Sequence, residues 1–507
     1  MINIRKLENE LWESADLLRS GSNLTANEYC MPVMGLIFLR YAYSRFRLVE
    51  SELMKNRPSR NGRVKPVEAA DFISKSALYL PKEAQYEYLL NLPENIAALE
   101  LKNGSGQTLN SLGEVVNYAM ELIEGQSDQL RGVLPKEYTI FSDEILKELL
   151  RIFNNSALND VGGDVFGRIY EYFLNKFAKN IASDDGVFFT PKSLVKMIVN
   201  IIEPKKGVLL DPACGSGGMF IQSGDFVTAA GEKPTHAMTF YGQEINLTTY
   251  NLCRINMFLH DIGFEKFSIA HEDTLIEPQH WDDEPFEVIV SNPPYSIKWA
   301  GSDNPLLIND PRFSPAGVLA PKSKADMAFI MHSLSWLATN GTAAIVCFPG
   351  IMYRGGAEQK IRQYLIDNNY IDCIIQLPSN LFYGTSIATC IMVLKKAKND
   401  NKILFIDASK ECIKVTNNNK LTEENISKIV GEFSSREEVR YFAHLADHSE
   451  VVENDYNLSV STYVEQEDTR EVIDIVKLNA EIREIVAREQ VLRDEIDKII
   501  EEISNQN

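Results

Sequence analysis

The 507-residue chain lacks the features of a membrane protein or of a disulfide-stabilised secreted protein. No stretch reaches the roughly 18 consecutive apolar residues that span a bilayer, and the best candidate, residues 30–39, contains Pro32. The seven cysteines form no CxxC pair, so neither a disulfide framework nor a zinc site is predicted. The first residues show no signal-peptide pattern. We therefore expect a cytoplasmic protein without a metal site.

Positive charge is also scarce, with 51 Lys and Arg against 71 Asp and Glu, for a net charge of -20. A protein that binds nucleic acid unaided usually carries a basic surface, because affinity depends mainly on neutralised phosphates. The chain contains no Walker A sequence and no convincing nuclease signature. Contact with DNA would have to be local or supplied by a partner, and any ATP-driven step would belong to another subunit.

Three patterns follow one another along the chain. Apolar residues recur at helical spacing from residue 11 to 178, which predicts an N-terminal helical bundle. Between residues 208 and 407, short apolar runs rich in β-branched residues alternate with loops and helical stretches, which predicts an α/β sheet of mainly parallel strands. The predicted strands are residues 208–210, 240–242, 288–291, 343–348, 371–377, 387–394 and 403–406. The predicted domains are residues 1–178, 179–410 and 411–507, the last being a helical region.

The tail carries a heptad pattern on one long predicted helix, residues 472–503. Its apolar residues follow a three-four alternation that only Glu489 interrupts. These residues are Ile475, Leu478, Ile482, Ile485, Leu492, Ile496, Ile499 and Ile503. Such a seam can pack on the helix's own domain or dock on a partner, and the pattern leaves both open.

A glycine-rich turn follows the first predicted strand, where residues 208–220 read Val-Leu-Leu-Asp-Pro-Ala-Cys-Gly-Ser-Gly-Gly-Met-Phe. The amides of Gly215, Ser216 and Gly217 can approach a ligand at the carboxyl edge of a parallel sheet, where open α/β folds bind nucleotides. Asp211 ends the strand, where a carboxylate can meet a cationic group.

Two more acidic residues follow later strand candidates. Glu244 lies in Tyr-Gly-Gln-Glu-Ile-Asn, residues 241–246, where a carboxylate can accept both hydroxyls of a ribose. Asp273 follows a third candidate strand, where it can receive an adenine amine or serve as a cap or turn residue. The order of Asp211, Glu244 and Asp273 indicates a site for an adenosyl group.

The most specific motif is Ser-Asn-Pro-Pro-Tyr-Ser at residues 291–296. Pro293 and Pro294 remove two backbone donors and fix an extended exit from the preceding strand. Methyl transfer to a planar nitrogen requires hydrogen-bond acceptors held in fixed positions, because they must bind the amine hydrogens before the lone pair of the nitrogen becomes available. The Asn292 side-chain carbonyl and the Pro293 carbonyl can accept them while Tyr295 stacks on the base.

With these motifs in this order, the chain resembles the gamma-ordered amino-methyltransferases, and specifically the modification subunits of type I restriction systems. The order is Phe-Phe-Thr-Pro at 188–191, the glycine turn, then Asn-Pro-Pro-Tyr. Similarity extends upstream to residues 11–16 and 28–41 and downstream to residues 324–329, 354–362 and 377–385, so it covers nearly the whole chain.

The resemblance implies a Rossmann-like S-adenosylmethionine methyltransferase sheet with an N-terminal helical bundle and a C-terminal coiled-coil helix. The segment Val187, Phe188, Phe189, Thr190, Pro191 and Lys192 would wrap the methionine end of the cofactor, whose cationic portion Asp211 would meet. Gly215, Ser216 and Gly217 would form the cofactor loop, Glu244 would hold the ribose and Asp273 would receive the adenine amine. Phe382 or Tyr383 would bracket a flipped adenine, or belong to the core.

The resemblance also implies partners. The substrate would be double-stranded DNA with the target adenine flipped out of the stack, since a pocket cannot reach a base inside a duplex. No recognition domain is apparent in the sequence, so a DNA specificity subunit would bind two copies of this chain. An ATP-dependent restriction and translocase subunit would complete the complex.

Three other functions remain compatible with the motifs. A glutamine-amide methyltransferase acting on protein also uses Asn-Pro-Pro-Tyr, although it needs neither the helical N-terminal domain nor the tail. Methylation of the N4 amine of cytosine is chemically close, and Asn292 in place of Ser favours adenine. A non-catalytic assembly subunit would have no need of Asp211, Glu244 and Asn292.

Overall fold

The structure is a computed structural model, and its described part forms two compact units, Met1–Val464 and Glu465–Asn507. None of the described helices combines the length and apolar character that a membrane crossing requires. The described residues are 3–55, 59–60, 63–64, 67–73, 75, 77–159, 163–181, 190–283, 285–382, 385–415, 418–466 and 475–505.

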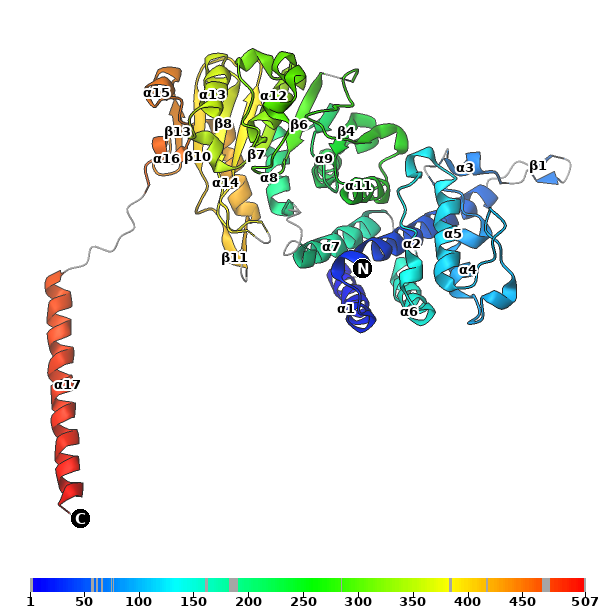
Figure 1. Cartoon of the computed structure of the whole chain (residues 1–507), viewed down its shortest axis with the longest axis horizontal. Helices are drawn as coiled ribbons and strands as arrows, with labels where there is room; N and C mark the ends of the chain where they lie inside the picture. The colour runs from blue at the N-terminus through cyan, green and yellow to red at the C-terminus, as the bar shows by residue number, and fades with distance from the viewer. Residues whose placement is uncertain are drawn as a thin grey trace. The chain divides into compact units, whose positions relative to one another are not determined.

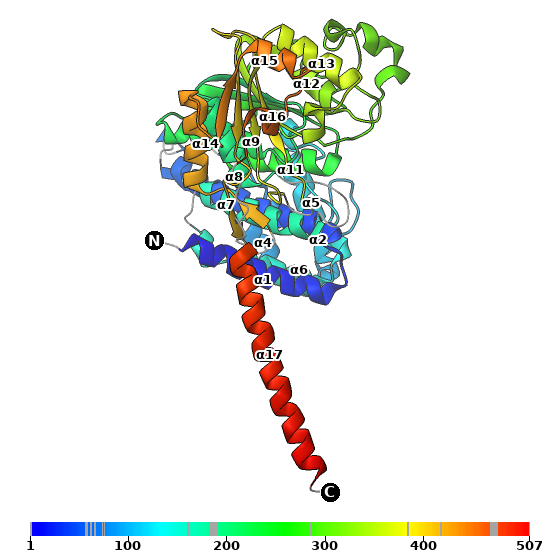
Figure 2. The same cartoon turned by 90° about the vertical axis from the view of Figure 1, so that its left-hand side faces the viewer.

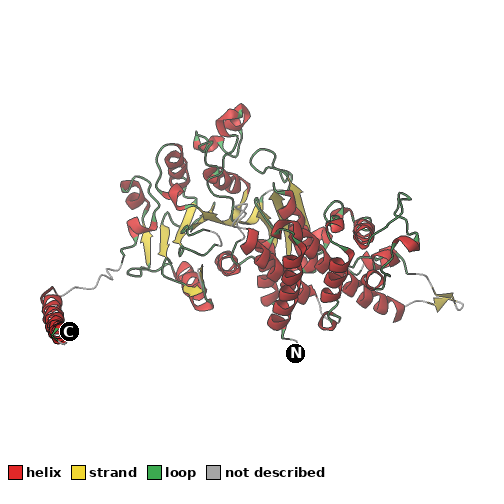
Figure 3. Ribbon diagram, turned by 60° about the horizontal axis from the view of Figure 1, so that its bottom comes forward, coloured by secondary structure: helices red, strands yellow, loops and turns green. Residues whose placement is uncertain are grey.

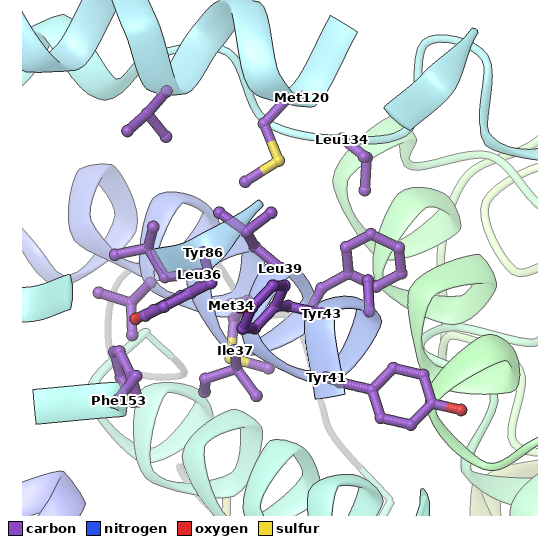
Figure 4. Packing of buried hydrophobic residues seen from close by; sticks show 14 of the residues in the cluster. Met34, Leu36, Ile37, Leu39, Tyr41, Tyr43, Tyr86, Met120, Leu134 and Phe153 are labelled. Atoms are coloured by element: carbon purple, nitrogen blue, oxygen red, sulfur yellow. The ribbon is translucent and has the colours of Figure 1, made fainter. Parts of the chain in front are cut away.

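The N-terminal part is the predicted helical bundle, built around α2 (Ala26–Lys55). Figure 4 shows side chains of this helix packing with Tyr86, Met120 and Phe153 in one apolar core. The other helices are α1 (Ile4–Ser22), α3 (Ala69–Ile73), α4 (Tyr86–Leu90), α5 (Leu112–Glu124), α6 (Asp143–Phe153) and α7 (Gly163–Ile181). A short hairpin of β1 (Ser59–Arg60) and β2 (Arg63–Val64) follows α2.

A nine-stranded mixed sheet forms the rest of the first unit, in the order β13-β10-β8-β9-β7-β6-β3-β4-β5 (Figure 1). All seven strands predicted by residue number lie in it, and the candidate strand before Asp273 is β5. The strands are β3 (Gly207–Asp211), β4 (Met238–Glu244), β5 (Phe267–His271), β6 (Phe286–Ser291), β7 (Leu337–Cys347), β8 (Ile371–Gln376), β9 (Cys390–Lys395), β10 (Ile403–Asp407) and β13 (Ala443–Ala446). Strands β9 and β13 are antiparallel to their neighbours, and the other pairings are parallel.

Helices cover both faces of the sheet (Figure 3), because its strands point successive apolar side chains to opposite faces. Leu209 packs in the core with α8, α9 and α14, whereas Leu210 packs in the core with α12 and α13. Figure 2 shows α12 and α13 across the sheet from α14. The helices are α8 (Lys192–Ile202), α9 (Gly218–Ala229), α10 (Pro234–Ala237), α11 (Leu247–Leu259), α12 (Asp326–Trp336), α13 (Ala357–Asp367), α14 (Glu423–Ser435), α15 (His448–Glu453) and α16 (Val460–Tyr463).

Helix α11 joins the helical bundle to the sheet. Its residues Leu252, Ile255 and Phe258 are buried in the core of the N-terminal bundle. On the same helix, Cys253 and Met257 are buried in a core of the sheet. The bundle is therefore placed directly against the sheet within one unit.

Residues 411–466 contain helices α14, α15 and α16, as the helical prediction expects, but also strands that it did not include. They contain a hairpin, β11 (Ile413–Val415) with β12 (Asn418–Lys420), and strand β13, which extends the sheet beyond β10. The Ala-His-Leu-Ala sequence of β13 has no β-branched residue and only four positions, so its pattern gave no strand signal. The three-domain division at residues 178 and 410 stays a prediction.

The second unit contains α17 (Ile475–Ser504), a 30-residue helix that confirms the long tail helix. All of its side chains are exposed, including the eight residues of the heptad seam, whose exposed fractions run from 45% at Leu478 to 69% at Ile475.

Candidate functional site

The predicted motif residues gather at one edge of the sheet. Strands β6, β3, β4 and β5 are neighbours and parallel, so their carboxyl ends meet at the same edge, where open α/β sheets bind ligands. Asp211 ends β3, Glu244 ends β4, and Asn292 directly follows β6. These three residues, far apart in sequence, thus occupy adjacent strand ends.

Asp211 is a buried carboxyl between the glycine turn and the Asn-Pro-Pro-Tyr turn. It is 2% exposed, and its Oδ1 atom accepts hydrogen bonds from the Ser291 hydroxyl at 2.8 Å and the Ala213 amide at 3.1 Å. Burial raises the pKa of Asp211 to about 7, although these two hydrogen bonds act in the opposite direction. The bond from Ser291 ties the end of β6 to the end of β3.

The glycine turn is fastened to its surroundings by two side chains. Glu244 accepts the Gly215 amide at 2.9 Å through Oε2 and the Asn246 amide at 2.8 Å through Oε1. Asn256 of α11 donates to the Ser216 carbonyl at 2.9 Å. A carboxylate has about four lone-pair positions, so Glu244 retains acceptor capacity for a ligand.

Gly217 needs to be glycine for two reasons. Its φ of 81° lies in the left-handed region that side chains disfavour. A Cβ atom at this position would also lie 2.8 Å from the Cys253 sulfur. The turn therefore packs closely on α11 while it begins helix α9.

Hydrogen bonds hold both ends of the Asn292 amide. Its Nδ2 atom donates to the Thr190 hydroxyl at 2.9 Å, and its Oδ1 atom accepts a hydrogen bond from the Tyr295 hydroxyl. The Tyr295 ring meets Phe382 edge to face at 6.1 Å between centroids. Phe382 is fully buried, which fits the prediction that it belongs to the core. Burial raises the pKa of Tyr295 well above its usual value, so this hydroxyl stays a donor.

A cavity lies between these residues and the helical bundle. Six of the predicted site residues line it, namely Thr190, Lys192, Asp211, Gly215, Ser216 and Asn292. The motifs did not reveal the lining residues carried by helices, which include Glu171, Asn175, Gln222, Thr249 and Asn256. Lys192 Nζ lies 2.7 Å from the Glu171 carboxylate, so α7 of the bundle contributes directly to this cavity.

Several other predicted residues do not line this cavity. Pro191, Gly217 and Glu244 do not line the cavity but lie beside it. Pro191 and Gly217 are next in sequence to lining residues, and Glu244 accepts the amide of one, Gly215. Asp273 accepts the Leu275 amide at 2.9 Å, which is the turn role considered for it, and its adenine contact stays a prediction. Val187, Phe188, Phe189 and Tyr383 lie outside the described residues. Within the described part of the chain, no three His, Cys, Asp or Glu residues cluster as metal ligands would.

Comparisons with known proteins agree along the chain. Residues 161–472 match the family model described as N-6 DNA Methylase, and residues 7–153 match the HsdM N-terminal domain. The methylase subunit of the type I restriction enzyme MpnII from Mycoplasma pneumoniae is 37% identical, over 98% of this chain and 96% of the relative. The MjaIX methylase subunit from Methanocaldococcus jannaschii is 30% identical, over 98% of this chain and 91% of the relative.

A solved structure shares both domains and their arrangement. It is the methyltransferase subunit of a type I restriction-modification system from Streptococcus thermophilus, with a TM-score of 0.79 and 30% identity. The match covers 92% of this chain and 100% of the other. The helical bundle and the sheet domain described above are thus a shared architecture.

Proposed function

The chain belongs to the N-6 DNA methylase family, and from this premise we propose how its residues carry out the reaction. It is an adenine DNA methyltransferase, the modification subunit of a type I restriction-modification system. The family decides against the cytosine, protein-glutamine and non-catalytic alternatives. The observation that carries the proposed mechanism is the placement of Asn292 beside Asp211, with its amide held on both sides.

We propose S-adenosylmethionine as the cofactor, because the donor set at the sheet edge matches its parts. Asp211 offers a buried carboxylate to the cationic methionine portion, with Thr190, Pro191 and Lys192 around that end. Gly215 and Ser216 of the glycine turn line the cavity beside the ligand, and Glu244 retains acceptor capacity for the ribose hydroxyls. Asp273 stands beyond β5 for the adenine amine. When bound, this cofactor supplies an electrophilic methyl group.

Asn292 and Pro293 prepare the adenine amine. The Asn292 side-chain carbonyl and the Pro293 carbonyl each accept one amine hydrogen, which draws the nitrogen towards tetrahedral geometry and exposes its lone pair. The Asn292 oxygen has two lone pairs, so it can accept from the amine while the Tyr295 hydroxyl still donates to it. The cofactor would supply the methyl group as its sulfur–methyl bond breaks and the neutral thioether leaves. The methylated amine would be acidic and would release one proton to water, so Asn292 and Pro293 need only accept hydrogen bonds and no strong base is needed.

Recognition of the DNA sequence belongs to a partner in this proposal. The net charge of -20 opposes unaided approach to phosphates, and the relatives are named as subunits. We propose that two copies of this chain flank one specificity subunit, with the seam of α17 docking on that subunit's helices. A separate ATP-dependent restriction subunit would perform translocation and cleavage. Deleting the chain from residue 472 onward should leave cofactor binding intact and abolish assembly.

The test of catalysis uses the complex purified from its native host and genomic DNA that lacks the modification. Asn292→Ala should retain cofactor affinity and lose tritium transfer from labelled S-adenosylmethionine by about two to three orders of magnitude, as when one stabilising group of a transition state is removed. Asn368→Ala, at the exposed end of α13, is the matched control. Activity near wild type in Asn292→Ala would refute the assigned role, and digestion of the DNA should yield N6-methyladenine.

A further inference from the structure

The backbone that leaves the Asn-Pro-Pro-Tyr turn is held by the segment before α12. The Ser296 amide donates to both carboxylate oxygens of Asp326, each at 3.1 Å. The Ala325 amide donates to the Ile297 carbonyl at 2.9 Å, and the Trp299 amide donates to the carbonyl of residue 322 at 3.0 Å. The exit of the turn is therefore fixed over four residues by a segment about 30 positions later in the sequence.

Ser296 adopts a conformation that needs such support. Its φ of 51° lies in the left-handed region, which is unfavourable for a residue with a side chain. Conformations of this kind persist where the surrounding structure over-determines them, and they cluster at active sites. The Ser296 side chain itself is exposed, so the hydrogen bonds of its backbone, and not its packing, provide the hold.

The turn has few backbone hydrogen bonds of its own, although the Tyr295 hydroxyl donates to Asn292 Oδ1 within it. Pro293 and Pro294 have no amide hydrogen, so the four residues from Asn292 to Tyr295 contain only two backbone donors. The entry is fixed by β6 and by the bond from Ser291 to Asp211. The exit depends on Asp326, a carboxylate that is only 6% exposed and that begins α12, a rigid element of the core.

We infer that Asp326 is a positioning residue for methyl transfer: by holding the Ser296 amide, it sets the course of the turn that aims the Asn292 and Pro293 carbonyls at the adenine amine. This inference rests on the proposed roles of Asn292 and Pro293. Asp326 does not line the cavity beside Asp211. Its removal should therefore lower the turnover number and leave cofactor affinity unchanged.

The experiment measures cofactor affinity by calorimetry and tritium transfer to unmodified genomic DNA, with the complex purified from its host. Asp326→Ala should reduce kcat by about tenfold to a hundredfold, the range expected for losing a hydrogen bond to a buried charged group. The dissociation constant for S-adenosylmethionine should stay within about twofold of wild type, since RT ln 2 is well below the energy of such a bond. Asp326→Asn keeps one acceptor and should lose less.

A second substitution separates positioning from general damage to the fold. Glycine adopts the left-handed conformation without strain, so Ser296→Gly added to Asp326→Ala should recover part of the lost kcat. Asp372→Asn, at a carboxylate that is 3% exposed and paired with Lys395 and Arg436, is the matched control and should keep wild-type turnover. Its thermal midpoint, compared with that of Asp326→Asn, measures the cost of removing a buried charge.

Two results would overturn the inference: a wild-type kcat in Asp326→Ala, or an equal loss in Asp326→Ala with and without Ser296→Gly. If Asp326→Ala does not fold, the comparison of Asp326→Asn with Ser296→Gly/Asp326→Asn decides in the same way. The activity of Asn292→Ala distinguishes a failure of the proposed chemistry from a failure of the role of Asp326. If it remains active, the proposed chemistry fails, whereas if it alone is inactive, only the role of Asp326 fails.

Discussion

Cofactor binding should depend on pH through Asp211. Burial raises the pKa of this carboxyl to about 7, so it is mostly protonated at pH 6 and mostly ionised at pH 8. The cationic methionine end of S-adenosylmethionine favours the ionised form. Binding at pH 6 must therefore release a proton, whereas binding at pH 8 does not.

The magnitude follows from the linkage between protonation and binding. The difference between about 7 and the ordinary value of 3.8 corresponds to roughly 4 kcal/mol favouring the protonated form. For one linked proton, the dissociation constant should rise about tenfold from pH 8 to pH 6. Without cofactor the raised pKa sets the sign for folding. The contribution of Asp211 to stability is fully present below its unfolded value of 3.8, falls as the pH rises to about 7, and is level above it.

Calorimetry at pH 6, 7 and 8, in two buffers of different ionisation enthalpy, measures both the affinity and the protons released. About one proton should leave at pH 6 and almost none at pH 8. Asp211→Asn should bind more weakly and show no such dependence. Glu358→Gln is the control, because burial also raises the pKa of Glu358 while this carboxyl does not line the cavity. Equal wild-type affinity at pH 6 and 8, with the protein folded at both, would refute the reasoning.

Three further predictions concern the glycine turn and the tail. Glu244→Ala should weaken cofactor binding by about tenfold or more, since hydrogen bonds to a charged group are lost; unchanged calorimetric affinity would exclude Glu244 from the site. Gly217→Ala should lower the thermal midpoint, because the added Cβ meets the Cys253 sulfur and the residue keeps a positive φ; an unchanged melting curve would contradict this packing. Ile496→Glu should abolish co-purification with the specificity subunit while Lys498→Glu, on another face of α17, should not; retained assembly in both would remove the seam from the interface.

The site residues at the strand ends could be predicted, because each lies in a short sequence motif. Asp211, Glu244 and Asn292 each come at or just after the end of a short apolar run, and parallel strands bring their carboxyl ends to one edge. The tail helix could be predicted for a similar reason, because the heptad period is visible within neighbouring residues of the sequence. The order of the strands in the sheet depends on contacts between residues far apart in the sequence, and no sequence pattern predicted it.

The helix-borne part of the site could not be predicted. Glu171 and Asn256 belong to helices whose patterns indicate only which face is buried, and their position beside the glycine turn depends on tertiary packing. The bond between Thr190 and Asn292 joins residues 102 positions apart, and no motif contains both. Asp273 illustrates the opposite difficulty, because a carboxylate after a strand fits a ligand or its own turn equally well, and its observed partner is the Leu275 amide.

The Ser291 hydroxyl connects the two halves of the site. It donates to Asp211 Oδ1 and immediately precedes Asn292, so the carboxyl that we propose to face the cofactor also holds the start of the Asn-Pro-Pro-Tyr turn. A hydrogen bond to an ionised acceptor is roughly twice as strong as one to a neutral acceptor. The ionised form of Asp211 that favours the cofactor is therefore also the form that holds Ser291 more firmly. We therefore expect cofactor binding and the placement of the Asn292 carbonyl to be coupled through this buried carboxylate.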